Sequence, residues 1–164
     1  PEQPILYDEL TLAEHLHLLL AAHGQDNDKS WDRVSRLLNM FRLQDKQHWV
    51  PIHFSKGMRQ KVMLVSAFML EAPLLIIDEP FLGLDTLAQR DVVTLIREQT
   101  QLGHSVLMTT HLLASAAKFV DQFVVLNNGQ VDFVGTPSAL ADKYQLSVAN
   151  LDDYFDLVRK ETGA

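Results

Sequence analysis

Apolar residues recur at intervals of three and four over the first 70 positions, the spacing of amphipathic helices. Thr11 to His23 and Ser30 to Phe41 are the first two such segments, and a short, poorly patterned connection follows. A third helix is predicted from just after Ser55 to Leu70, because Glu71-Ala72-Pro73 halts it. The first part of the chain is therefore predicted to be helical.

After Pro73 the pattern alternates between short apolar runs and longer periodic segments. In chain order these are a strand over 74–77, a helix over 87–102, a strand over 105–110, a helix over 112–120 and a strand over 123–126. This alternation predicts right-handed crossovers and a parallel sheet buried on both faces. Asn128-Gly129 then leads to 131–134 and is a preferred two-residue hairpin turn, so the sheet is predicted to end in an antiparallel edge. Helical segments are expected from Ser138 and from Leu151.

The composition narrows the class of protein. The chain has 164 residues, of which 47% are hydrophobic and 21% charged, and no apolar run approaches the roughly 20 residues of a membrane helix. Disorder and a membrane span are excluded. A net charge of −7 repels phosphate backbones, so no nucleic-acid partner is expected. The absence of cysteine removes disulfides, thiol catalysis and thiolate metal sites.

The strongest chemical signal is the adjacent carboxylate pair Asp78 and Glu79, directly after the apolar run 74–77. Ligands bind at the carboxyl ends of strands in open α/β sheets. Neighbouring residues on an extended chain point in different directions, so one carboxylate can hold a cation while the other reaches a water. The alternative is a solvated strand end whose acids cap the next turn.

Two further groups of residues that could bind a phosphate are expected at the same edge of the predicted sheet. Ser55 can cap the third helix, and Gly57 lets an oxyanion approach backbone N–H groups at the positive end of the helix dipole. A plain capped helix start with basic surface residues is the alternative. His111 follows the strand 105–110 and can donate to a phosphate oxygen or orient a water. A histidine there can also be merely structural.

These segments resemble the motifs of ATP-binding cassette (ABC) proteins. Phe54 to Met58 resembles the signature motif, usually Leu-Ser-Gly-Gly-Gln, and Ile77 to Pro80 resembles the end of the Walker B strand. Gly83-Leu84-Asp85 is similar to the D-loop, and Thr110-His111 to the switch histidine. Pro4 to Thr11 is similar to the segment after the Q-loop glutamine. The Q-loop position itself falls on Glu2 or Gln3, and the pattern does not choose between them.

The resemblance implies an α/β fold in which a helical subdomain precedes the second half of a P-loop NTPase (RecA-like) core, a mostly parallel sheet with helices on both faces. Residues 1–72 would hold the Q-loop remnant and the helical subdomain with the signature motif. Residues 73–136 would form the carboxyl-terminal half of the ATPase core, and residues 137–164 the carboxyl-terminal helices.

The resemblance also implies a role for each motif residue. Asp78 would bind Mg²⁺ through water, Glu79 would polarise the water that attacks the γ-phosphate of ATP, and His111 would contact that phosphate. Asp85 would help the halves of a dimer communicate. Ser55 and Gly57 would bind the γ-phosphate of ATP held mainly by the opposite subunit. Departures from the usual motif are Lys56 and Met58, which give this anion site a charge and remove an amide.

None of the seven glycines belongs to a Walker A loop, which supplies the main grip on the ATP phosphates. The sequence, which opens at Pro1, is therefore expected to be the carboxyl-terminal portion of a longer nucleotide-binding domain, inactive by itself. The leading hypothesis is the ATPase subunit of a membrane transporter on the cytoplasmic face of the cell membrane. Its expected partners are a second nucleotide-binding domain, in a homodimer or heterodimer, and a transmembrane permease. The alternatives are a soluble ABC ATPase of translation or DNA maintenance, or a non-enzymatic interaction module.

Other candidate binding sites have weaker support in the sequence. His15 and His17 do not share a helix face and make a poor metal pair. Lys56, Arg59 and Lys61 are expected to form a solvated face rather than a nucleic-acid patch. Four leucines of the first helix are expected in the core: Leu16, Leu18, Leu19 and Leu20. An exposed apolar strip among them would support docking onto a membrane partner.

Overall fold

The computed structural model describes residues 5–162, which form two compact units that divide between Thr109 and Thr110. The first unit holds the three predicted amino-terminal helices and two strands, and the second holds a hairpin and the last helices. The candidate Q-loop residues Glu2 and Gln3 lie outside the described residues. The division of the chain into segments 1–72, 73–136 and 137–164 stays a prediction.

The first unit opens with α1 (Leu12–Ala22), α2 (Asp28–Met40) and α3 (Lys56–Phe68). Each begins at a polar cap that accepts a hydrogen bond from the backbone N–H three residues on, and these caps are Thr11, Asn27 and Ser55. The connection between α2 and α3 contains the short 3₁₀ turns η1 (Gln44–Lys46) and η2 (Pro51–His53), which the sequence pattern did not predict. The three predicted helices are confirmed, and their ends lie within about two residues of those expected.

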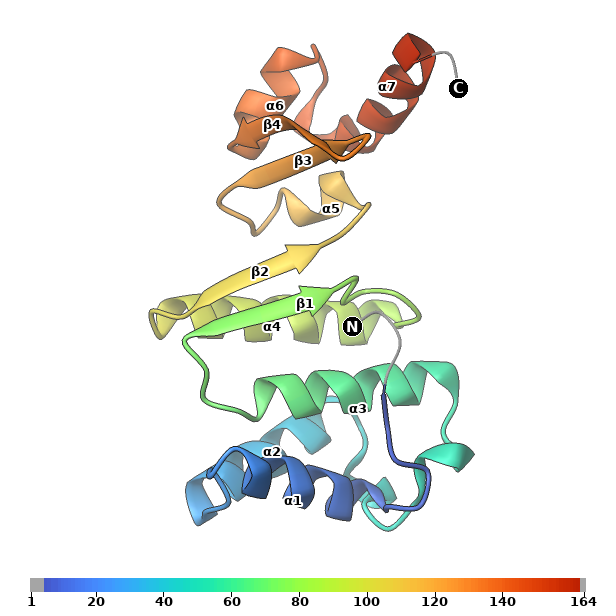
Figure 1. Cartoon of the computed structure of the whole chain (residues 1–164), viewed down its shortest axis with the longest axis vertical. Coiled ribbons are helices and arrows are strands. Elements are labelled where there is room, and N and C mark those ends of the chain that lie inside the picture. Colours follow the sequence, from blue (N-terminus) through green and yellow to red (C-terminus); the bar gives the residue numbers. More distant parts are fainter. Residues whose placement is uncertain (1–4, 163–164) are drawn as a thin grey trace. The chain divides into compact units, whose positions relative to one another are not determined.

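The core between these helices is largely leucine. Leu16 and Leu20 of α1 are buried together with Leu37 of α2 and Val65 of α3. Leu18, however, has an exposed fraction of 44%, so the prediction that it lies in the core was wrong. Successive residues of a helix are about 100° apart, and consecutive leucines cannot all point to one side. In Figure 1, α1 and α2 lie on one side of α3, with β1 and α4 on the other.

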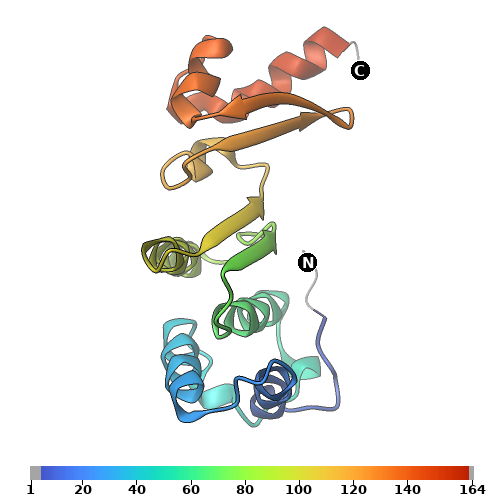
Figure 2. The same cartoon turned by 60° about the vertical axis from the view of Figure 1, so that its left-hand side comes forward.

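The sheet of the first unit consists of β1 (Leu74–Asp78) and β2 (Ser105–Thr109), joined by α4 (Thr86–Gln101). The strands are parallel and in register from Leu74 opposite Ser105 to Asp78 opposite Thr109. Figure 2 looks nearly along α4, which lies on one side of the two strands. The predicted parallel pairing is confirmed.

The two faces of this sheet differ from the prediction of burial on both sides. Leu75 and Ile77 are buried, but Ile76 on the opposite face has an exposed fraction of 70% and Leu107 of 57%. Within the described part of the first unit, α4 packs on β2 and leaves these apolar side chains uncovered. Both faces of the strands are apolar, as the sequence indicates. Only one of them is buried among the described residues, because burial depends on which segments cover each face.

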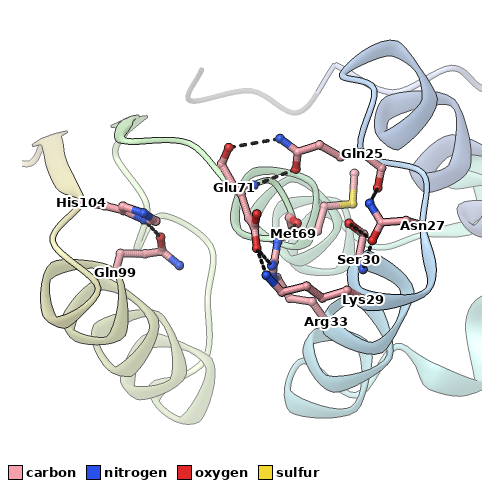
Figure 3. A network of polar contacts seen from close by, with 9 residues as sticks. All are labelled: Gln25, Asn27, Lys29, Ser30, Arg33, Met69, Glu71, Gln99 and His104. Atoms are coloured by element: carbon pink, nitrogen blue, oxygen red, sulfur yellow. Dashed lines mark hydrogen bonds and ion pairs between the residues drawn. The ribbon is translucent and has the colours of Figure 1, made fainter.

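Charged and amide side chains tie α2 to the connection between α3 and β1 (Figure 3). The side-chain amide of Gln25 donates to the Glu71 carbonyl at 3.1 Å and accepts from the Glu71 N–H at 2.8 Å. Lys29, at 2.8 Å, and Arg33 both pair with the Glu71 carboxylate, and their hydrogen bonds lower its pKa. Arg36 adds a two-pronged contact to Glu98 of α4, with distances of 3.1 and 2.9 Å. Polar contacts thus hold the helical layer to the strand-bearing part of the unit.

The second unit contains α5 (Leu113–Ala116), the strands β3 (Phe123–Asn127) and β4 (Gln130–Gly135), α6 (Pro137–Lys143), η3 (Val148–Asp153) and α7 (Tyr154–Thr162). Asn128 and Gly129 join the strands with φ of 48° and 75°, as the predicted turn requires. In the described residues β3 pairs only with β4, so the continuous sheet expected from 74 to 134 is observed as two separate strand pairs.

One carboxylate organises the end of the second unit. Asp132 of β4 accepts hydrogen bonds from the hydroxyls of Tyr144 and Tyr154, the latter at 3.0 Å. The ammonium of Lys143 donates to the backbone carbonyl of Asp132 at 3.0 Å. The hydroxyl of Tyr144, followed by that of Tyr154, lowers the pKa of Asp132. Because Tyr154 is almost fully buried, this contact fastens the hairpin to the segments that follow it.

Candidate functional site

The two predicted carboxylates lie at the carboxyl end of β1, where Thr109 of β2 faces Asp78 across the parallel pair. The Thr109 hydroxyl donates to Oδ1 of Asp78 and accepts from the backbone N–H of Glu79 at 3.1 Å. One side chain therefore contacts both residues of the pair. Thr109 was missed by the sequence reasoning, which passed from the strand directly to His111; the signal was a hydroxyl at the same strand end as the carboxylates.

The backbone turns sharply at Glu79. Its φ is 46°, in the left-handed region that few residues other than glycine adopt, and its carbonyl accepts from the Leu82 N–H at 3.2 Å. Asp78 is exposed at the strand end, whereas Glu79 is half-buried. The turn separates the environments of two adjacent carboxylates, as a division of labour between them requires.

The donor chemistry at Asp78 is compatible with Mg²⁺. This ion prefers oxygen ligands, keeps several waters and is commonly held by one or two carboxylates together with substrate phosphates. Among the side chains that the structure describes, residues 5–158, there is no group of three or more histidine, aspartate or glutamate residues arranged to hold a metal. A site in which this part of the chain contributes one carboxylate therefore fits, and an all-protein cage does not.

The anion site is predicted at the amino-terminal end of α3. Oγ of Ser55 accepts from the Met58 N–H at 3.3 Å, which confirms the predicted cap. The first turn has no acidic residue, and Lys56 is exposed on it. The positive end of the helix dipole and a cation thus meet at one helix end without a carboxylate from this turn. Such an end suits a phosphate group.

Gly57 has a second requirement that the sequence did not reveal. A Cβ atom at Gly57 would lie 3.0 Å from the carbonyl oxygen of Gly83, in the loop after β1. That distance is tighter than ordinary packing allows, so the absence of a side chain lets the start of α3 approach this loop. Gly83 has φ of 73°, which favours glycine there as well. The signature-like segment and the D-loop-like segment are therefore in direct contact within one chain.

Asp85 caps α4 and pairs with α3. Its Oδ1 accepts from the Ala88 N–H at 2.8 Å, and its Oδ2 lies 2.8 Å from Nζ of Lys61, whose side chain is only 14% exposed. The hydrogen bond from Lys61, followed by that from the Ala88 N–H, lowers the pKa of Asp85 to about 2. The expectation that Lys61 lies on a solvated basic face was wrong, because Lys61, in the second turn of α3, faces the loop that ends at Asp85.

Arg59 departs from the same expectation. It is half-buried, and its Nε donates to the Pro51 carbonyl at 3.1 Å, which fixes η2 to α3. Of the three basic residues considered, only Lys56 is exposed.

The roles predicted for the site residues all stay predictions, those of His111 and Met58 included. His111 belongs to the second unit, where it is exposed and follows Thr110, whose hydroxyl accepts from the Leu112 N–H at 3.1 Å. Met58 is half-buried on the first turn of α3. On α1, His15 is buried and burial lowers its pKa, whereas the exposed His17 pairs with Asp26 at 3.0 Å. The two histidines face different surroundings, which agrees with their rejection as a metal pair.

Comparison with known proteins gives the family. The family model described as ABC transporter matches residues 1–82, half of the chain. The chain belongs to the ABC transporter family. It is 46% identical to the ABC-type transporter ATP-binding protein EcsA of Bacillus subtilis over 99% of its own length, and 30% identical to the human phospholipid-transporting ATPase ABCA3 over 88%. A solved structure, described as the ATP binding subunit of an ABC transporter, covers 96% of the chain at 46% identity with a TM-score of 0.88.

The ABC family assignment covers only part of such a protein. The chain spans 66% of EcsA, 66% of the solved ATP binding subunit and 8% of the much longer ABCA3. The part of the chain that the structure describes contains no helix both long and apolar enough to cross a membrane.

Proposed function

We propose that this chain is the carboxyl-terminal portion of the ATP-binding subunit of a membrane transporter, and that the complete subunit hydrolyses ATP to drive transport. The observation that carries the proposal is the strand-end pair Asp78 and Glu79, held by one threonine at the edge of a parallel sheet. The family assignment and the 46% identity to a transporter ATP-binding protein support it.

Each residue takes a role that its surroundings permit. Asp78 presents an exposed carboxylate to Mg²⁺. Glu79 accepts a proton from, or polarises, the attacking water, and its half-buried position differs from the exposed position of Asp78. His111 contacts the γ-phosphate. When bound, ATP would supply the reacting phosphoryl group, and Mg²⁺ would neutralise part of its negative charge.

The anion site on α3 implies a second nucleotide-binding domain. Ser55 caps α3, and Lys56, Gly57 and Met58 follow in its first turn, so this helix end offers N–H donors and a cation to a phosphate. The resemblance to ABC proteins assigns that phosphate to ATP held mainly by an opposite subunit. Asp85, at the start of α4 and in contact with α3, joins this helix end to the loop after Glu79.

A transmembrane permease is the remaining partner, with the subunit bound to it at the cytoplasmic face of the membrane. The descriptions of EcsA and ABCA3 as transport proteins favour this proposal over a soluble ABC ATPase or a non-enzymatic module. No nucleic acid is proposed as a partner, because the net charge of −7 opposes it.

The test is Glu79→Gln in the full-length subunit that contains this chain. The amide keeps the size of the side chain but accepts no proton, so ATP binding is expected to persist while Mg²⁺-dependent hydrolysis falls by at least about 100-fold. The variant is expected to accumulate an ATP-bound dimer in sedimentation. Glu98→Gln on α4 is the matched control and is expected to retain hydrolysis.

Unchanged hydrolysis in Glu79→Gln would remove this residue from the reaction. A full-length subunit that binds no ATP would contradict the proposed function as a whole and favour an interaction module. The chain by itself is expected to hydrolyse ATP no faster than background, because it lacks a phosphate-binding loop.

A further inference from the structure

We propose that Thr109 is a positioning residue for ATP hydrolysis, which sets the relative placement of the Asp78 carboxylate and the Glu79 backbone. This inference rests on the proposed function. The Thr109 hydroxyl uses its proton toward Oδ1 of Asp78 and a lone pair toward the N–H of Glu79, at 3.1 Å. A hydroxyl is the smallest side-chain group that both donates and accepts, and here it does both at once.

The parallel register explains why this residue is in reach. Asp78 is the last residue of β1 and stands opposite Thr109, the last residue of β2. The backbone register ends at this pair, and the next N–H along the chain, that of Glu79, donates to the side chain of Thr109. This hydrogen bond extends the strand pair by one residue at its carboxyl edge.

The contact matters because Glu79 takes an unfavourable backbone conformation. A non-glycine residue at φ of 46° persists only where its surroundings hold it there. The Thr109 hydroxyl holds its N–H, and the Leu82 N–H holds its carbonyl at 3.2 Å. The direction in which the Glu79 side chain leaves the backbone is set between these two contacts. A small rotation there would move a catalytic carboxylate away from its water.

Thr109 is exposed, as is Asp78, so water can satisfy the groups that it leaves if it is replaced. Thr109→Val keeps the shape and the β-branched preference for strands but removes the hydroxyl. Thr109→Val is therefore expected to fold normally and to disturb only the placement of Asp78 and Glu79. Thr109→Ser keeps the hydroxyl and is the conservative rescue.

The experiment measures steady-state ATP hydrolysis by the full-length subunit at saturating Mg²⁺. Thr109→Val is expected to lower kcat by about 10-fold to 100-fold, the loss typical of a hydrogen bond to a charged group, with KM for ATP changed by less than about 3-fold. Thr109→Ser is expected to stay within about 3-fold of the wild-type kcat. Thr94→Val is the matched control, because the Thr94 hydroxyl bonds only its own helix, at the Arg90 carbonyl.

A second readout needs no turnover. Amide hydrogen exchange at Glu79 in the nucleotide-free protein is expected to be at least about 10-fold faster in Thr109→Val and close to wild type in Thr109→Ser, because the exchanging proton is the one that Thr109 accepts. Wild-type exchange at Glu79 in Thr109→Val would overturn the inference. So would a kcat within 2-fold of wild type, or Thr109→Ser as impaired as Thr109→Val.

These outcomes separate the inference from the proposed function. A wild-type subunit that hydrolyses ATP while Thr109→Val does so equally well refutes only the role of Thr109. A wild-type subunit without Mg²⁺-dependent hydrolysis refutes the proposed function and the catalytic role of Thr109 together, whatever the exchange at Glu79 shows.

Discussion

The ammonium of Lys61 lies 2.8 Å from the carboxylate of Asp85, and this pair joins the second turn of α3 to the capping residue of α4. The Lys61 side chain is 14% exposed and that of Asp85 58%. The cation is thus shielded along its length while the carboxylate still meets water. Together with the approach of Gly57 to Gly83, the pair gives the start of α3 two contacts to the loop that follows the candidate catalytic residues.

We predict that Lys61→Met lowers the melting temperature of the protein by several degrees, because it leaves Asp85 without its cation. Lys29→Met is the matched control: Lys29 also lies 2.8 Å from a carboxylate, that of Glu71, but it is 77% exposed. Water and salt screen that pair, so its loss is expected to cost less. Differential scanning calorimetry of both variants measures the contrast.

The same pair predicts an acid dependence of stability. The pKa of Asp85 is lowered in the folded protein to about 2, from an ordinary value near 4, so its contribution is complete above about pH 4 and is lost as the pH falls toward 2. The Lys61→Met protein is expected to show a shallower loss of stability over this window. The prediction would be wrong if wild type and Lys61→Met lost stability with pH at the same rate, or if Lys61→Met and Lys29→Met had the same melting temperature. Either result would mean that the shielded Lys61 stabilises the fold no more than the exposed Lys29 does.

His15 predicts a dependence at higher pH. Burial lowers its pKa, so the unfolded chain binds a proton more readily than the folded protein between the lowered value and about 6.5. The folded protein is therefore destabilised as the pH falls through that range. Above about pH 6.5, where His15 is neutral in both states, this destabilisation is absent. His15→Leu is expected to flatten the loss of stability between about pH 7 and 5 in denaturant titrations.

The control for His15→Leu is His48→Gln, at an exposed histidine. This variant is expected to leave the pH slope unchanged. An unaltered slope in His15→Leu would show that His15 does not govern the dependence. Nδ1 of His15 is buried without a hydrogen-bond partner, so the leucine variant is also expected to be no less stable than wild type at pH 8.

The carboxylate of Asp132 predicts a cost for each tyrosine hydroxyl that it accepts. Tyr144→Phe is expected to lower the free energy of unfolding by about 1–2 kcal/mol, because a hydrogen bond to a charged group is lost. It is also expected to raise the pKa of Asp132, since the Tyr144 hydroxyl is the largest cause of its lowering. Urea titration and an NMR titration of Asp132 measure the two effects. Tyr7→Phe, at an exposed ring, is the control, and equal stability of the two variants would contradict the prediction.

Short sequence patterns were sufficient to predict individual helices, strands and turns. A serine before an apolar periodic segment predicted the cap of α3, and Asn128-Gly129 predicted a turn that needs two positive φ angles; both are found. The adjacent acids after an apolar run predicted the strand-end pair Asp78 and Glu79. Each of these signals lies within a few consecutive residues, where propensity and sterics act directly.

Contacts between distant residues were not predictable in the same way. Lys61 lies 24 positions from Asp85, and Thr109 lies 31 from Asp78. A lysine on a helix and a threonine on a strand have no sequence signature that names such partners. Within residues 5–162, the pairing of β3 with β4 alone and the open face at Ile76 depend likewise on which segments meet in space.

The left-handed backbone at Glu79 limits what can replace it. Among the described residues the other non-glycine positions with positive φ are Arg42, Asn128 and Gln145, and only at Asn128 is the side chain a type that tolerates this region well. Glycine at position 79 would relieve roughly 1 kcal/mol of crowding around Cβ. The carboxylate would be lost with it. At this position the residue that best suits the backbone differs from the residue that the proposed hydrolysis needs, so we expect Glu79→Gly in the full-length subunit to be the more stable protein and to hydrolyse no ATP.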